Sequence, residues 1–222
     1  AAMMRAAAAA RPDAMLAAPA DDAALEGPVA EVNALGTPLI GFGNRMAGDF
    51  CAFVGADDRR MGETIATHLL DALGGAGHVV LIEGPQSAPT ARDRGEGFRA
   101  ALARYPGVTL LGTAPGRYLR EGGREAMRAH LAAHPRIDGV ICTNDLMALG
   151  ALDVLDEAGR SALVVGNNGT IEAAQAIAAG RLLASMDYCG LKMGAVAMIA
   201  ALRHLDGQPV PRIILLPAQV TH

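Results

Sequence analysis

The stretch from Ile137 to Leu155 constrains the fold more than any other part of this chain. Its first six residues, Ile-Asp-Gly-Val-Ile-Cys, end in an apolar run of strand length, and a polar corner follows at residues 143–145. Apolar residues at helical spacing then begin at once, at positions 146, 149, 152 and 155. The pattern predicts a strand, a polar corner and a helix. In an open parallel sheet, ligands bind at such corners, outside the carboxyl ends of the strands.

Asn144 in this corner allows two interpretations. Its amide offers both a donor and an acceptor, which suits a hydroxyl-rich ligand. Asn144 and Asp145 are also typical residues for capping the helix that follows. The segment alone leaves both interpretations open. Other polar corners at equivalent places favour a ligand role for Asn144, whereas we expect Asp145 to start the helix.

The same alternation of short apolar runs and helical patterns continues along the chain, which predicts an α/β protein with mostly parallel strands. Strands are expected at Ala14–Leu16, Leu39–Gly43, Phe53–Gly55, Val79–Glu83, Val108–Gly112, Val140–Thr143, Leu163–Gly166 and Leu183–Met186. Helices are expected in the alanine-rich first ten residues and near 21–34, 60–73, 91–104, 120–133, 146–157, 171–179 and 192–205.

Several classes of function find no support in the sequence. The net charge of −4 and the absence of a basic block argue against binding nucleic acid by charge. No apolar run approaches the roughly 20 residues of a membrane helix, so no membrane insertion is expected. The three cysteines and six histidines are scattered, and neither a dinucleotide motif, a phosphate-binding loop nor a nucleophile elbow is present. We therefore expect a protein that is not an enzyme and holds no metal or cofactor.

Polar groups follow four other predicted strands, at residues 44–45, near Arg92, at 167–168 and at 187–188. All these corners lie on one edge of a parallel sheet, which is the geometry of a binding cleft. Arg92 is informative because a cation in the first turn of a helix opposes the helix dipole. It is explained either by a ligand or by an ion pair with Glu96, one helical turn later.

Four segments together carry a specific resemblance to the type I periplasmic solute-binding proteins of ABC importers, in the ribose-binding-like sugar branch. The effector domains of LacI-type repressors share that fold. The segments are Gly43-Asn44-Arg45, residues 91–98 (ARDRGEGF), residues 143–152 (TNDLMALGAL) and residues 164–170 (VVGNNGT). In order and spacing they cover nearly the whole chain.

This resemblance implies a two-lobed periplasmic-binding-protein-like I fold, in which each lobe is a mostly parallel, doubly wound sheet. Residues 1–56 and 189–212 would form the N-terminal lobe, and residues 57–188 and 213–222 the C-terminal lobe. In the family, the two lobes close on a sugar by a hinge motion. The resemblance begins only after the segment that forms the first two strands in the family. The N-terminal lobe is therefore expected to be incomplete in this chain.

The resemblance also implies the ligand contacts, the partner and the location. The ligand would be a monosaccharide or a related hydroxylated molecule in the interlobe cleft, the partner an ABC transporter permease in the membrane, and the location the periplasm. The alternative is the ligand-sensing effector domain of a LacI-type regulator. Carried over position by position, the contacts are Asn44, Arg45, Arg92, Tyr118, Asn144, Asn168 and Tyr188, with Asp187 as a further candidate.

Two departures from the family pattern bear on the ligand. Asn44 and Asn168 stand where sugar-binding members usually have Asp, while Arg45 and Arg92 are kept. This change shifts the pocket toward positive charge and suggests a sugar acid. Tyr188 stands where the family often has an amide, so ribose itself is not assigned as the ligand.

Overall fold

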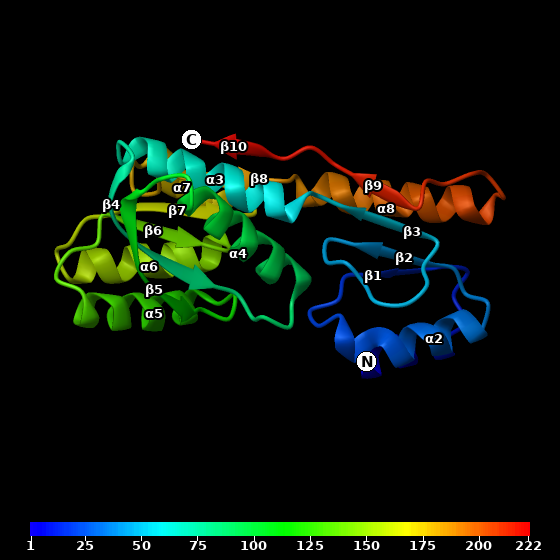
Figure 1. The fold of residues 1–222 in the computed structure, drawn as a ribbon. Coiled ribbons are helices and arrows are strands. Elements are labelled where there is room, and N and C mark those ends of the chain that lie inside the picture. Colours follow the sequence, from blue (N-terminus) through cyan, green and yellow to red (C-terminus); the bar gives the residue numbers. More distant parts are fainter. The chain divides into compact units, whose positions relative to one another are not determined.

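The computed structural model describes all residues from 1 to 222, and the chain forms two compact units. The first comprises residues 1–57, 87–90 and 189–217, and the second residues 58–86, 91–188 and 218–222. Each contains helices packed on a sheet whose strands are mostly parallel (Figure 1). The predicted α/β class with mostly parallel strands is confirmed.

The first unit is built on a four-stranded parallel sheet in the order β1-β2-β3-β9. Its strands are β1 (Met15–Ala17), β2 (Leu39–Phe42), β3 (Ala52–Gly55) and β9 (Ile213–Leu215). Its helices are α1 (Ala2–Ala9), the short 3-10 helix η1 (Ala23–Leu25), α2 (Glu26–Ala34) and α8 (Gly190–Leu205).

Apolar side chains from α1 and α2 cover one face of the first unit's sheet. Met4 of α1 and Val29 and Val32 of α2 pack with Met15 and Leu39 in one buried cluster. Helix α8 lies against β1, β2 and β3 on the other face (Figure 1). The sheet is therefore sandwiched between helices, as expected of a doubly wound unit.

The second unit is built on a six-stranded sheet in the order β10-β8-β7-β6-β4-β5. Only the edge strand β10 runs antiparallel, against β8. The strands are β4 (Ala76–Glu83), β5 (Gly107–Pro115), β6 (Gly139–Cys142), β7 (Leu163–Asn167), β8 (Ala184–Asp187) and β10 (Gln219–Thr221). The helices are α3 (Asp58–Ala72), α4 (Pro89–Leu102), α5 (Arg120–Ala133), α6 (Asp145–Glu157) and α7 (Ile171–Ala178).

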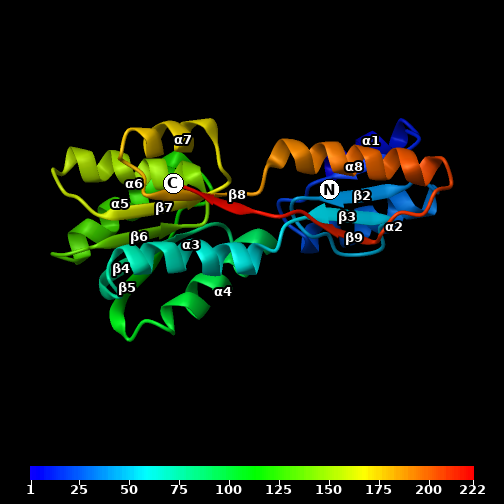
Figure 2. The same cartoon turned by 90° about the horizontal axis from the view of Figure 1, so that it is seen from above.

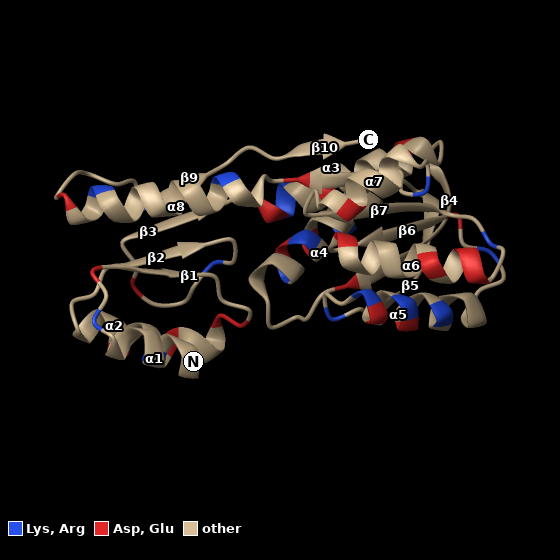
Figure 3. Cartoon of the chain, turned by 180° about the vertical axis from the view of Figure 1, so that it is seen from behind, with Lys and Arg blue, Asp and Glu red and all other residues tan.

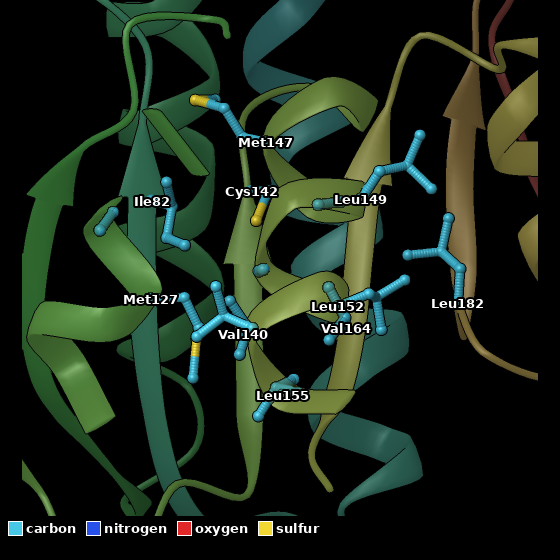
Figure 4. Packing of buried hydrophobic residues seen from close by; sticks show 14 of the residues in the cluster. Ile82, Met127, Val140, Cys142, Met147, Leu149, Leu152, Leu155, Val164 and Leu182 are labelled. Carbon is cyan, nitrogen blue, oxygen red and sulfur yellow. The ribbon is translucent and has the colours of Figure 1, made fainter. Parts of the chain in front are cut away.

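Helices cover both faces of this second sheet (Figure 2). α5, α6 and α7 share one buried cluster, in which Met127, Leu152 and Leu155 pack on Val140 and Val164 of the strands (Figure 4). α3 lies on the opposite face with α4, and its predicted apolar stripe is buried at Met61, Ile65 and Leu69. Strands covered on both sides are mostly apolar, which is why β6 and the first four residues of β7 show no polar alternation.

The outer surfaces of α5 and α6 are joined by ion pairs rather than by apolar contacts. Figure 3 shows arginines on α5 beside acidic residues on α6. Arg120 pairs with Asp153 at 2.8 Å, and Arg124 reaches both Asp153 and Glu157. These ion pairs lie at the surface of the unit, where water screens them, so they stabilise the fold only weakly.

Two short strands were not predicted from the sequence, and they change the division of the chain. β9 pairs with β3, so residues 213–217 belong to the first unit, whereas the predicted boundary lay after residue 212. Residues 87–90 also belong to the first unit. The chain therefore adds one more strand to the first sheet before β10 joins the second.

No helix in this structure has both the length and the apolar character needed to cross a membrane.

Candidate binding site

The polar corners of the second unit lie at one edge of its sheet. Strands β4, β6, β7 and β8 are mutually parallel neighbours, so their carboxyl ends face the same way. The residues that end or follow these strands include Gly84, Thr143, Asn168 and Tyr188. We refer to this row of residues as the carboxyl edge of the second unit.

Arg94 of α4 joins these corners into one network. It is buried, and its Nε donates to Asp58 Oδ1 at 2.8 Å. Its Nη1 donates to the Thr143 carbonyl oxygen at 2.8 Å and to Asn168 Oδ1 at 2.9 Å. Its guanidinium carbon also lies 5.7 Å from the centre of the Tyr188 ring. A buried charge needs such partners, and here they tie the ends of β6, β7 and β8 to α4.

Two glycines bring Arg94 to this position by letting α3 and α4 cross closely. A Cβ on Gly97 would lie 2.1 Å from the Arg59 carbonyl oxygen, and a Cβ on Gly62 would lie 2.3 Å from the Arg94 carbonyl oxygen. Both distances are far below any real contact, so only glycine fits at either position. The glycines of the ARDRGEGF segment thus serve packing, and through it the placement of Arg94.

Asn144 is the cap of α6. Its Oδ1 accepts a hydrogen bond from the Met147 backbone N–H at 3.0 Å, and its Nδ2 donates to the Tyr118 carbonyl oxygen at 3.1 Å. One N–H of the amide remains beyond these two bonds. The capping interpretation of Asn144 is therefore correct, and a ligand contact would use only the remaining N–H.

Asp145 starts α6, as predicted, but its side chain also has a structural role. It is fully buried, and it accepts hydrogen bonds from Ser185 Oγ at 2.6 Å and from the Thr170 backbone N–H at 2.8 Å. Burial raises the pKa of this carboxyl, and the hydrogen bonds from Ser185 and Thr170 oppose that shift. Asp145 thus links α6 to the ends of β7 and β8.

Tyr118 is held in a strained turn between β5 and α5. Arg117 and Tyr118 both have left-handed backbones, with φ of 55° and 63°. The Tyr118 ring lies so close to Gly84 that a Cβ there would be 2.4 Å from it. The Gly84 N–H in turn donates to Thr143 Oγ1 at 2.7 Å. This turn sets an aromatic face beside the corner that follows β6.

The corner after β7 contains two asparagines with different surroundings. Asn168 is half-buried and has a strained φ of 126°, outside the left-handed helical region in which asparagine is enriched. Asn167 is fully buried, and its Nδ2 donates to the Cys142 carbonyl oxygen at 3.0 Å. The Asn167 Oδ1 has no hydrogen-bond partner.

The remaining candidates of the second unit lie at its rim. Arg92 Nη1 donates to the Gln86 carbonyl oxygen at 2.9 Å. Tyr188 is half-buried, and burial raises the pKa of its hydroxyl while Arg94 opposes the shift. Asp187 ends β8 and packs against Gly169, where a Cβ would come within 2.5 Å of the Asp187 side chain.

The two candidates of the first unit follow β2. Asn44 is half-buried, and its Oδ1 accepts a hydrogen bond from the Thr90 backbone N–H at 3.3 Å. Arg45 is exposed.

Arg94, Asp58 and Asn167 were not among the predicted site residues. Arg94 sits in the same segment as Arg92, and the sequence alone gives no reason to choose the second arginine. Gly95 and Gly97 beside it were the available signal, because glycines inside a helix indicate close packing against a neighbour.

Comparison with known proteins identifies the family. A family model described as a periplasmic binding protein domain matches residues 1–209. The ribose import binding protein RbsB of Bacillus subtilis is 32% identical over 210 residues, which cover 94% of this chain and 68% of that protein. A xylitol-binding protein of Mycolicibacterium smegmatis is 31% identical over 199 residues, covering 87% of this chain and 55% of that protein.

Solved structures give the same result. The solute-binding protein of an ABC transporter from Actinobacillus succinogenes, solved with bound D-allose, superposes with a TM-score of 0.93 at 25% identity. The match covers 99% of this chain and 81% of that one. These relatives are named as binding proteins, in agreement with the expectation that the chain is not an enzyme. The chain belongs to the periplasmic binding protein family, in its type I, ribose-binding-like sugar branch.

Proposed function

We propose that this protein is the substrate-binding component of an ABC sugar importer and that it binds a monosaccharide or a related hydroxylated ligand. The observation that carries the proposal is the carboxyl edge of the second unit, where Arg94 donates hydrogen bonds to Asn168 and Thr143 and lies over the Tyr188 ring. Ligand sites of this kind combine a few fixed polar groups with rigid aromatic faces. The molecules named with the relatives, namely ribose, xylitol and D-allose, are all polyhydroxylated.

Each residue has a distinct proposed role. Tyr118 and Tyr188 contact the apolar face of the ligand, while Asn144, Asn168 and Arg92 donate hydrogen bonds to its oxygens. Asp187 accepts from a ligand hydroxyl. Asn44 and Arg45 of the first unit are proposed as further contacts. These contacts would make binding specific, because a ligand that leaves a buried polar group without a hydrogen-bond partner loses about 1–3 kcal/mol of binding free energy.

The partner and the location follow from the same proposal. A substrate-binding component delivers its ligand to a membrane permease, so we propose a periplasmic location and an ABC permease as partner. Ligand-dependent stimulation of ATP hydrolysis by the reconstituted permease complex would test this step. If the protein binds its ligand but ATP hydrolysis by the permease complex is not stimulated, the proposed partnership is wrong and the proposed ligand binding still stands.

A thermal-shift screen against pentoses, hexoses, polyols and sugar acids tests ligand binding. A ligand present at 100 times its dissociation constant should add about 2.7 kcal/mol to the free energy of unfolding. Asn168→Ala should abolish that shift. Asn33→Ala is the matched control, because the Asn33 amide donates to the Asp49 carbonyl oxygen at the surface of the first unit. Absence of a shift with every class of compound would contradict the proposed function.

A further inference from the structure

The three asparagines proposed as ligand contacts all direct their amide oxygen at a donor within the protein. Asn168 Oδ1 accepts from Arg94 Nη1 at 2.9 Å, and Asn144 Oδ1 accepts from the Met147 N–H at 3.0 Å. In the first unit, Asn44 Oδ1 accepts from the Thr90 N–H at 3.3 Å. Each amide oxygen therefore already has a partner within the chain.

These partners fix which end of each amide remains for a ligand. A guanidinium and a backbone N–H can only donate, so the atom that faces them must be the amide oxygen. Each of the three side chains then has only its Nδ2 group left to bind a ligand. Asn144 gives one of its two N–H bonds to the Tyr118 carbonyl oxygen and keeps the other. Arg94 thus acts as a positioning residue, because its charge holds the Asn168 amide in one orientation.

The acceptors at the carboxyl edge are largely used within the protein. Asp58 and the Thr143 carbonyl oxygen both accept from Arg94. Asp145 accepts from Ser185 and Thr170, and Thr143 Oγ1 accepts from the Gly84 N–H. The Asn167 oxygen has no partner, but it is fully buried. Asp187, the remaining carboxylate at this edge, also has an interaction partner within the protein. Donors are therefore in surplus at this edge.

A surplus of donors favours a ligand group that accepts without donating. A sugar hydroxyl brings a donor that needs an acceptor of its own, whereas a carboxylate only accepts. Hydrogen bonds to an ionised carboxylate are also about twice as strong as those between neutral groups, and a guanidinium such as that of Arg92 matches carboxylate geometry. We propose that the ligand is a polyhydroxylated carboxylate, a sugar acid, whose carboxylate accepts hydrogen bonds from Asn168 Nδ2 and Arg92. This inference rests on the proposed sugar-binding function and names its substrate class.

Calorimetric titration with matched pairs tests the inference: D-ribonate against D-ribose, D-gluconate against D-glucose, and D-galactonate against D-galactose. We expect the tightest ligand to be an aldonate, bound at least about tenfold more tightly than its aldose, which equals about 1.4 kcal/mol. A neutral sugar as the tightest ligand overturns the inference and leaves the proposed function standing. Binding of none of the six compounds overturns both.

A single substitution tests the role of the Asn168 amide. Asn168→Asp keeps an oxygen that accepts from Arg94 but replaces the outward donor with a charged acceptor. We expect aldonate affinity to fall at least about tenfold, while aldose affinity stays or rises. Asn33→Asp adds the same charge at an exposed site of the first unit and should change neither affinity. Unchanged aldonate affinity in a folded Asn168→Asp variant overturns the inference.

Discussion

Asn144 shows how one side chain can stabilise a helix and still offer a group to a ligand. Its oxygen caps α6, and one N–H holds the carbonyl of the strained Tyr118 turn. The sequence predicted the corner correctly, because an apolar strand followed by Asn and a helical pattern is a strong local signal. It could not decide between cap and contact, since both use the same amide. That choice depends on partners from other parts of the chain.

Asn144→Ser separates the two roles. A serine hydroxyl also caps helices well, so the free energy of unfolding should fall by less than in Asn144→Ala, which should lose about 1 kcal/mol. Both variants lose the amide N–H, and both should therefore bind ligand more weakly. Urea denaturation and calorimetric titration measure the two effects. Full ligand affinity in Asn144→Ser would show that Asn144 is a cap alone.

We expect the stability of the second unit to depend on pH through His130. It is buried in α5, with Nε2 3.4 Å from the Leu81 carbonyl oxygen, and its ring stacks on that of His134. Burial lowers the pKa of His130 below its ordinary value of 6.5, and a charge on His134 acts in the same direction.

The sign of this effect follows from proton binding. Below a pH of about 6.5 the unfolded chain takes up a proton at this histidine that the folded chain resists, so the free energy of unfolding should fall as pH decreases. His130→Gln should flatten that dependence, as measured by denaturant unfolding at a series of pH values. The pH series should span about 7.5 to 5.5, where histidine usually titrates. If the free energy of unfolding changes equally with pH in both proteins over that range, this prediction is wrong.

The buried position of Arg94 could not be predicted from the sequence around it. Its burial depends on the crossing of α3 and α4, and its partners come from residues 58, 143 and 168. Arg92, two residues earlier, was predicted as a contact, and the structure places it at the rim, bonded to the Gln86 carbonyl. Which of two nearby arginines turns inward is decided by packing between distant segments.

At the scale of elements, the crossing of α3 and α4 offers a direct test. Gly97→Ala would set a Cβ 2.1 Å from the Arg59 carbonyl oxygen, so the helices must separate. We expect the free energy of unfolding to fall by about 1–3 kcal/mol, a typical cost of overpacking. Ligand affinity should fall as well, because Arg94 moves with α4.

Gly194→Ala in α8 is the matched control. A Cβ at this position has no neighbour within 4 Å, and alanine is the better helix former. This variant should gain about 0.5–1 kcal/mol in the free energy of unfolding. Equal losses in the two variants, measured by urea denaturation, would contradict the close crossing of α3 and α4.

Most helices and strands could be predicted because their apolar periodicity is local. The α5 prediction, Arg120–Ala133, agrees with the structure at both ends. The helix predicted over 21–34 is divided into η1 and α2, and the other helices differ by one or two residues at their ends. β9 was missed although it lies in four consecutive apolar residues, 213–216, between Pro211 and Pro217. β10 was missed because it has only three residues and no apolar run. β10 depends on its pairing with β8, and no local pattern in the sequence indicates that pairing.

At the scale of the whole molecule, the last residues of the chain complete the sheet of the second unit. β10 pairs with β8 through Gln219, Val220 and Thr221. The β8 residue Ser185 also donates to the buried Asp145. The end of the chain therefore covers a strand that helps to hold the carboxyl edge.

Deletion of residues 218–222 should loosen β8 selectively. We expect the backbone amides of residues 184–187 to exchange hydrogen at least about tenfold faster, equivalent to about 1.4 kcal/mol, while the first unit keeps its protection. Hydrogen exchange read by mass spectrometry measures both regions. Gln219→Ala keeps the backbone pairing and is the control. Unchanged exchange in β8 after the deletion would contradict a stabilising role for β10.

Both units draw on distant parts of the chain, and this has a consequence for synthesis on the ribosome. Residues 1–57 cannot dock α8 or β9 until about 150 further residues have been made, and the second sheet gains β10 later still. At about 5–20 residues per second, the nascent first unit stays unfinished for on the order of ten seconds. During that interval its sheet lacks the α8 cover, so the growing chain should be a client of chaperones that shield apolar surface.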